Sequence, residues 1–293
     1  MKNEKEFTLD RKFVNVLGSK MHYVEAGEGN TFLFLHGNPT SSFLWRNIIP
    51  PVAHYGRTIA PDLIGFGKSD KPKMGYRFLD HYRYLETFIQ EMNLKDMVLV
   101  GHDWGGVLGF YYAMNHLENV KGISFFETFP FTFSWDYFPL RYKIAFRLFR
   151  TPLVGQFLIM VLNVFINQML PGAVVKKLPK EVLEEYQKPF QTIQSRYPIY
   201  VWPNELPIEG RENETFRVIK KLELFLPKFD IPMLLLTASP GGVIRKEKIE
   251  WLRKKIKNLT IKDVGNGIHF LQEDNPEGIT GVILDWAKQF LFV

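Results

Sequence analysis

Short runs of apolar residues alternate along this chain with longer segments in which apolar residues recur every three or four positions. The first pattern predicts β-strands and the second predicts amphipathic helices. Thr31–Leu35 is a nearly continuous apolar run, which is typical of a strand buried on both faces of a parallel sheet. We expect strands at residues 13–17, 21–25, 31–35, 58–60, 97–100, 122–126, 233–237 and 259–263, and helices at 82–92, 107–115, 246–257 and 278–290.

Strands that alternate with helices predict an α/β protein with a mostly parallel, eight-stranded sheet and helices on both faces. The first two strands are expected to form a hairpin through Gly18 and Ser19. About a hundred residues after Phe126 contain no convincing strand, but they contain helical runs at 143–149, 157–169 and 181–190. They predict an inserted helical lid over the carboxyl edge of the sheet, where open α/β sheets bind ligands. The predicted division is a core of residues 1–127 and 226–293 with a cap of residues 128–225.

Composition excludes several classes of protein. Apolar residues make up 46% and charged residues 23% of the chain, which is ordinary for a globular protein. The absence of cysteine excludes disulfides and thiolate metal sites. The net charge is +6, and the densest basic cluster, residues 245–257, has the spacing of an amphipathic helix rather than of a nucleic-acid groove. The 26 phenylalanines indicate a Phe-rich core or an apolar cavity.

The chain contains no convincing targeting or membrane-spanning segment. Residues 1–12 are charged and lack the apolar stretch of a secretory signal peptide. The longest apolar run, residues 153–166, is interrupted by Gly155, Gln156 and Asn163 and falls short of the roughly 20 residues of a membrane span. It predicts a buried or lid helix, with contact to a membrane surface as the less favoured alternative. We expect a cytoplasmic monomer or weak homo-oligomer without stable membrane insertion.

The segment 98–106, VLVGHDWGG, is an apolar strand, a turn flanked by glycines and the start of a helix. This is the pattern of a nucleophile elbow, with Asp103 where serine usually stands. The glycines leave room for a tight turn that exposes the central side chain above the sheet. A helix N-terminus also favours negative charge. The alternative is that Asp103 only caps the helix.

In proteins with such an elbow an acid and then a histidine follow the nucleophile along the chain. His269 is the one histidine that follows the last core strand, in a glycine-rich loop. The loop after the strand at 233–237 contains no carboxylate, so Glu127, at the end of the strand at 122–126, is the expected acid. His102 is adjacent to the nucleophile and is expected to point away from the site.

Two residues are candidates for binding an anion. Asn38 follows the strand at 31–35, where this architecture supplies a second backbone donor, so the N–H groups of Asn38 and Trp104 are the expected oxyanion hole. The side-chain amide of Asn38 and the indole of Trp104 form a donor pair suited to a diffuse anion. Alternatively, Asn38 is only a turn residue and Trp104 only packs.

Four segments together resemble the haloalkane dehalogenases of the α/β-hydrolase superfamily: HGNPTSS at 36–42, PDLIGFGKS at 61–69, GHDWGG at 101–106 and HFLQED at 269–274. The match extends from about residue 13 to 290. The resemblance implies a hydrolase that forms a covalent alkyl ester on Asp103, with His269 as base, Glu127 as acid and Asn38 and Trp104 as halide donors. It implies a small apolar halogenated substrate, a halide product, no cofactor and no metal. Pocket walls are expected from position and resemblance at Phe126, Phe129, Phe165, Met169, Val243, Ile268 and Leu271.

Other functions fit some of the same residues. The luciferases that use coelenterazine carry the same five residue types, and an epoxide hydrolase would use the same nucleophile with a lid tyrosine such as Tyr186, Tyr197 or Tyr200. A ligand-binding receptor with a vestigial site is a third alternative, which the complete set of residues disfavours. The lid is rich in apolar side chains, which leaves the pocket size open; these include Phe131, Phe133, Phe157, Met160 and Met169.

Overall fold

The structure, a computed structural model, describes residues 10–291. Most of residues 1–12, the segment that lacks the features of a signal peptide, therefore lies outside the described residues. Eight strands form one sheet in the order β1-β2-β4-β3-β5-β6-β7-β8. β2 is antiparallel to β1 and β4, and the other neighbours are parallel, which confirms the predicted sheet. The strands are β1 (Asp10–Val16), β2 (Ser19–Ala26), β3 (Thr31–Leu35), β4 (Arg57–Pro61), β5 (Met97–His102), β6 (Val120–Phe126), β7 (Met233–Pro240) and β8 (Leu259–Gly267).

The predicted hairpin of β1 and β2 is confirmed, but its turn lies one residue earlier than expected. Val16 pairs with Ser19, so Leu17 and Gly18 are the two turn residues. Both have positive φ, 50° and 80°, as a two-residue hairpin turn that matches the strand twist requires. Ser19 therefore belongs to β2.

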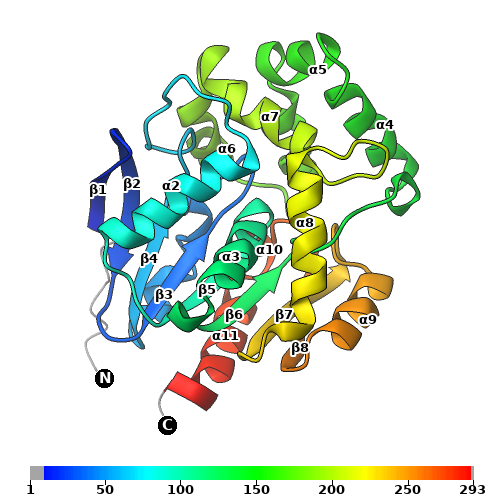
Figure 1. Ribbon diagram of the computed structural model, residues 1–293. Coiled ribbons are helices and arrows are strands. Elements are labelled where there is room, and N and C mark those ends of the chain that lie inside the picture. Colours follow the sequence, from blue (N-terminus) through cyan, green and yellow to red (C-terminus); the bar gives the residue numbers. More distant parts are fainter. Residues whose placement is uncertain (1–9, 292–293) are drawn as a thin grey trace.

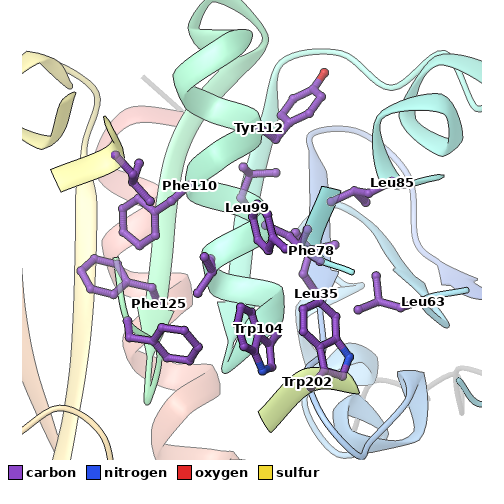
Figure 2. Packing of buried hydrophobic residues seen from close by; sticks show 14 of the residues in the cluster. Leu35, Leu63, Phe78, Leu85, Leu99, Trp104, Phe110, Tyr112, Phe125 and Trp202 are labelled. Atoms are coloured by element: carbon purple, nitrogen blue, oxygen red, sulfur yellow. The ribbon is translucent and has the colours of Figure 1, made fainter. Parts of the chain in front are cut away.

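Helices cover both faces of the sheet, because the apolar side chains of its central strands alternate between two cores. In β3, Leu33 and Leu35 face one core, whereas Phe32 and Phe34 face the other. Figure 2 shows Leu35, Leu99 and other side chains of the first core packed beneath α3. The first core is covered by α2 (Phe78–Glu91), α3 (Trp104–Asn115), α8 (Glu214–Phe225) and α9 (Lys246–Lys255), and the second by α1 (Ile49–Val52), α10 (Leu271–Asp274) and α11 (Pro276–Leu291).

Most of the residues between β6 and β7 form a group of helices beyond the sheet (Figure 1), whereas the last of these helices, α8, packs against α3. The expectation of one helix over 157–169 is wrong, because the chain breaks at Asn163, whose φ of 53° does not fit a right-handed helix. α7 was missed because it has Pro198 in its first turn and Pro203 in its interior, and proline argues against a helix interior. The helices are α4 (Leu140–Phe149), α5 (Val154–Gln156), α6 (Lys180–Gln187), α7 (Tyr197–Glu205) and α8.

The division into a core and a cap stays a prediction. α8 lies within the residues assigned to the cap, but it contacts α3 and packs on the sheet side of the molecule (Figure 1). Among residues 10–291, no single helix is long and apolar enough to cross a membrane. Only the pair Leu140–Phe149 and Val154–Val161, bent by 104°, reaches that length and composition together.

Candidate active site

Asp103 lies at a sharp turn between β5 and α3. Its backbone has φ 51° and ψ −131°, a conformation that costs a non-glycine residue on the order of 1–3 kcal/mol. A Cβ atom on Gly101 would lie 2.4 Å from Cα of Gly106, and one on Gly105 would lie 2.2 Å from the carbonyl oxygen of Leu35. The turn therefore needs both glycines, as the sequence pattern predicted.

The loop after β3 holds the Asp103 carboxylate. The backbone N–H of Asn38 donates to Oδ1 of Asp103 at 2.8 Å. A Cβ atom on Gly37 would lie 2.1 Å from that same oxygen, so glycine is needed for this close approach. Thr128 also donates its hydroxyl to the backbone carbonyl of Asp103 at 2.6 Å, a contact that sequence reasoning missed.

His269 lies between the two predicted carboxylates. Its Nε2 is 3.7 Å from Oδ2 of Asp103, and its Nδ1 is 3.3 Å from Oε2 of Glu127. Its backbone N–H donates to the carbonyl of Ala173 at 3.0 Å. The structure thus brings together the three residues that the sequence placed far apart.

His102 is buried below the site and contacts His269. Its ring centroid lies 4.6 Å from that of His269, and its Nε2 is 2.9 Å from the His269 carbonyl, which can only accept a hydrogen bond. Burial holds the pKa of His102 well below its usual value, so the ring is neutral with its proton on Nε2. His102 is absent from the cavity lining, as predicted, but it helps to fix the backbone of His269.

Glu127 is buried at the end of β6, with φ 46°. Its Oε2 accepts hydrogen bonds from the backbone N–H groups of Gly242, at 3.0 Å, and Val243, at 2.6 Å. A Cβ atom on Gly242 would lie 2.9 Å from Oε2. The loop after β7, which contains no carboxylate of its own, thus supplies the N–H donors that hold Glu127.

Burial acts in opposite directions on the two central groups. It raises the pKa of Asp103, and the positive charge of His269 and the N–H groups of Trp104 and Asn38 offset only part of this. Burial alone would lower the pKa of His269. The hydrogen bond to Glu127 and the negative charges of Asp103 and Glu127 outweigh burial, so the pKa of His269 is raised above 6.5.

A cavity of about 130 Å³ lies over Asp103. Its walls are mostly apolar and come from both the loops of the sheet and the helices above it. The predicted residues that line it are Asn38, Asp103, Trp104, Phe129, Phe165, Met169, Val243, Ile268 and His269.

Two predicted wall residues do not line the cavity. Phe126 is completely buried, and its ring packs against Trp45 and His102 because the alternation along β6 directs it to the opposite face of the sheet. Leu271 is the first residue of α10 and packs in the second core, and its neighbour Phe270 lines the cavity instead.

Sequence reasoning also missed an aromatic wall. Tyr142 and Phe146 of α4 line the cavity together with Phe138, two residues before the helix. They recur every fourth residue, so the helical spacing of these aromatic side chains was a signal that could have identified them. Phe133 and Tyr137, nearby in the chain, are also part of the lining.

One turn of α7 contacts both predicted halide donors. The ring of Trp202 stacks on that of Trp104, with centroids 4.3 Å apart; Figure 2 labels both side chains. The side-chain amide of Asn38 donates to the carbonyl of Ile199 at 3.4 Å. Pro203 has no N–H, so the α-helical hydrogen bond to the carbonyl of Ile199 cannot form and this acceptor is left for Asn38.

Comparisons with known proteins agree with this geometry. The profile of the alpha/beta hydrolase fold matches residues 30–171. A haloalkane dehalogenase from Mesorhizobium japonicum is 41% identical over 283 residues, which cover 95% of this chain and 91% of the relative. One from Bradyrhizobium diazoefficiens is 37% identical over 295 residues, which cover 96% and 95%.

A solved structure gives the same result. The crystal structure of haloalkane dehalogenase DbeA from Bradyrhizobium elkani superposes with a TM-score of 0.94 at 38% identity, covering 97% of this chain and 99% of that one. The sheet, the elbow and the order of the three residues define an α/β hydrolase. Within that class, the chain belongs to the haloalkane dehalogenase family. Among residues 10–291, no cluster of three potential ligands is arranged to hold a metal ion.

The raised pKa of Asp103 predicts that this carboxylate destabilises the fold at neutral pH. Between 3.8 and its raised pKa the folded protein binds more protons than the unfolded chain, so the free energy of unfolding falls as pH rises through that window. Asp103→Asn has no charge to desolvate. It is therefore expected to raise Tm at pH 7–8, by roughly 2–4 °C per kcal/mol gained, with the gain disappearing below about pH 3.8.

Calorimetry at several pH values measures this difference. Asp96→Asn is the matched control, because Asp96 has a similar φ of 52° but an exposed side chain. A lower Tm for Asp103→Asn than for the wild type at pH 8 would contradict the prediction.

Proposed function

We propose that this protein hydrolyses carbon–halogen bonds of small haloalkanes to an alcohol, a halide and a proton, through a covalent ester on Asp103. The observation that carries the proposal is a buried carboxylate in an apolar cavity, with a histidine 3.7 Å away that is itself paired with Glu127. As partners we propose a small apolar halogenated substrate and a halide ion. A cytoplasmic location, a monomeric or weakly oligomeric state and the lack of a nucleic-acid partner stay predictions.

The first step needs an anionic nucleophile. A tetrahedral carbon bonded to a halogen has no carbonyl to which a nucleophile could add, so an oxygen must displace the halide from behind. Oδ2 of Asp103 can do this, because Oδ1 is already held by the Asn38 N–H. Burial removes the water that would shield this oxygen, and its raised pKa makes it a stronger base than an exposed carboxylate.

The halide leaves without a proton and needs hydrogen-bond donors instead. The indole of Trp104 and the side-chain amide of Asn38 both border the cavity beside Asp103. Trp202 and Ile199 on α7 hold these two groups in place. We therefore assign the halide site to Trp104 and Asn38.

The second step is hydrolysis of the ester. The carbonyl of the ester can be attacked by water, from which Nε2 of His269 takes a proton. Glu127 accepts the hydrogen bond from Nδ1 and stabilises the imidazolium that forms. The oxyanion develops where the backbone N–H groups of Asn38 and Trp104 meet the carboxylate, and one such donor typically contributes about 2.7–4 kcal/mol. As the oxyanion collapses, the bond between the acyl carbon and the alkoxy oxygen breaks, the alcohol leaves with the proton held by His269, and Asp103 returns to its carboxylate form by releasing a proton.

The same observations disfavour the alternatives. The cavity has a volume of about 130 Å³. This is close to the roughly 150 Å³ of an engineered protein cavity that binds one benzene molecule, so the volume favours a small haloalkane over a multi-ring luciferin. Tyr186, Tyr197 and Tyr200 are not among the residues that line it, so they do not offer the acid of an epoxide hydrolase. Tyr137 does line it, but its hydroxyl donates to the carbonyl of Val243, and burial raises its pKa to about 12.

Removing the base should trap the ester. Because His269→Phe retains the nucleophile and the halide donors, we expect it to release one halide per protein from 1-iodobutane or 1,2-dibromoethane and then stop. Mass spectrometry should locate the added alkyl group on Asp103. Asp103→Ala is the control and should release no halide. Many turnovers by His269→Phe, or release without a covalent adduct, would contradict the scheme.

The pH dependence should differ between the free enzyme and the ester. The negative charge of Asp103 contributes to the raised pKa of His269, and esterification removes that charge. Because the base must be neutral, ester hydrolysis should increase with pH, and the midpoint should lie below the pKa of His269 in the free enzyme. Rapid-quench rates and NMR titration of His269 provide the two values. A kinetic midpoint equal to or above the NMR value would refute this account.

Pro203 should influence the halide site through Ile199. Pro203→Ala supplies an N–H that competes with Asn38 for the Ile199 carbonyl, so the halide affinity should fall about two- to tenfold, as for loss of one hydrogen bond. Product inhibition by bromide measures this affinity. Pro198→Ala is the matched control, because position 198 is in the first turn of α7, where no intrahelical partner is lost. Equal effects of the two substitutions would contradict the assignment.

A further inference from the structure

Residues 140–162, beyond the sheet, expose eight large apolar side chains. On α4, Leu140, Ile144 and Leu148 recur every fourth residue and are 72%, 51% and 44% exposed. Single exposed apolar residues are ordinary, whereas a patch of them marks an interaction surface. We call the set the outer cap face; it consists of Leu140, Ile144, Leu148, Leu153, Val154, Phe157, Val161 and Leu162.

The charge of this region has one sign. Residues 137–180 contain seven lysines and arginines and no aspartate or glutamate. This segment therefore carries +7, while the whole chain carries +6, so the rest of the chain sums to −1. Arg141 and Arg147 are exposed on α4, and Lys143 is paired with Asp136 at 2.7 Å. An apolar face bordered by cations fits an anionic, partly apolar partner.

The shape of the outer cap face fits a flat surface rather than a membrane-spanning segment. α4 has 10 residues and is about 15 Å long, half of the roughly 30 Å of a hydrocarbon core. The next segment, Val154–Val161, leaves α4 at 104°. The guanidinium of Arg196 donates to the carbonyls of Met160 and Val161, at the far end of this second segment. α4 and α5 lie at the edge of the molecule farthest from the sheet (Figure 1).

We propose that the outer cap face docks on the surface of an anionic lipid bilayer. Arg141 and Arg147 contact lipid phosphates, and the leucines, valines and Phe157 enter the boundary between headgroups and acyl chains. The opposite side of α4 carries Tyr142 and Phe146, which line the cavity. Docking therefore brings the cavity close to apolar compounds dissolved in the membrane; this consequence alone rests on the proposed function.

Co-sedimentation of the full chain with lipid vesicles tests the proposal without an enzyme assay. We expect binding to vesicles of phosphatidylcholine and phosphatidylglycerol, much weaker binding to phosphatidylcholine alone, and weakening at about 1 M salt. Arg141→Gln with Arg147→Gln should lower the partition coefficient about 30-fold. Leu140→Gln should lower it about tenfold.

Two control variants distinguish a specific effect of the outer cap face from a general effect of charge or hydrophobicity. Lys254→Gln with Lys255→Gln removes the same charge from the exposed end of α9, and Leu224→Gln removes a leucine that is 77% exposed on α8. Both should bind as the wild type does. No binding to anionic vesicles, or equal loss in the control variants, overturns the proposal. Binding that Leu140→Gln leaves unchanged also overturns it, because the apolar face then does not enter the bilayer.

The competing occupant is a second copy of the chain. Sedimentation velocity of the wild type and Leu140→Gln examines this. A dimer that Leu140→Gln dissociates, together with a lack of vesicle binding, would assign the face to self-association and overturn the proposal. Since vesicle binding and halide release are separate measurements, the failure of one leaves the other intact.

Discussion

The structure depends on one unfavourable arrangement, a carboxylate held in an apolar cavity at a strained turn. Asp103 has a positive φ, and burial raises its pKa. The surroundings offset part of this cost with the N–H groups of Asn38 and Trp104 and with the imidazole of His269. The glycine at position 37 follows from the same constraint, because the backbone there must approach the Asp103 carboxylate where no side chain fits. A site of this kind trades stability for a reactive oxygen.

The helices beyond the sheet position residues of the proposed site as well as enclosing its cavity. α7 contacts both proposed halide donors within one turn, and a proline inside that helix frees the carbonyl that Asn38 uses. α4 has aromatic side chains on the cavity side and exposed apolar side chains on the other. The placement of the proposed halide donors therefore depends on packing between α7 and the loops at the edge of the sheet.

The errors of sequence reasoning share a physical cause. Phe126 and Leu271 are apolar and adjacent to site residues, but strand alternation and the start of α10 direct them into the core. Asn163 interrupts the apolar run in the sequence, but a single polar residue does not by itself show that a helix over 157–169 breaks there; its φ of 53° does. α7 was missed because proline generally breaks helices, whereas here the missing N–H of Pro203 leaves the Ile199 carbonyl free to accept from Asn38. Local sequence patterns indicate the secondary-structure propensity of a segment, but they do not indicate which residues its side chains contact in the folded protein.

The sequence by itself determined the sheet, the elbow and the identity of the three central residues, because buried strands, glycine turns and the order of Asp103, Glu127 and His269 are properties of the chain. It also determined the family. Only the tertiary structure decided that backbone N–H groups of a loop without carboxylates hold Glu127, that His102 supports His269, and which aromatic side chains enclose the cavity. The hydrogen bonds to Glu127 and His269 join residues more than a hundred positions apart, and no pattern of spacing encodes such contacts.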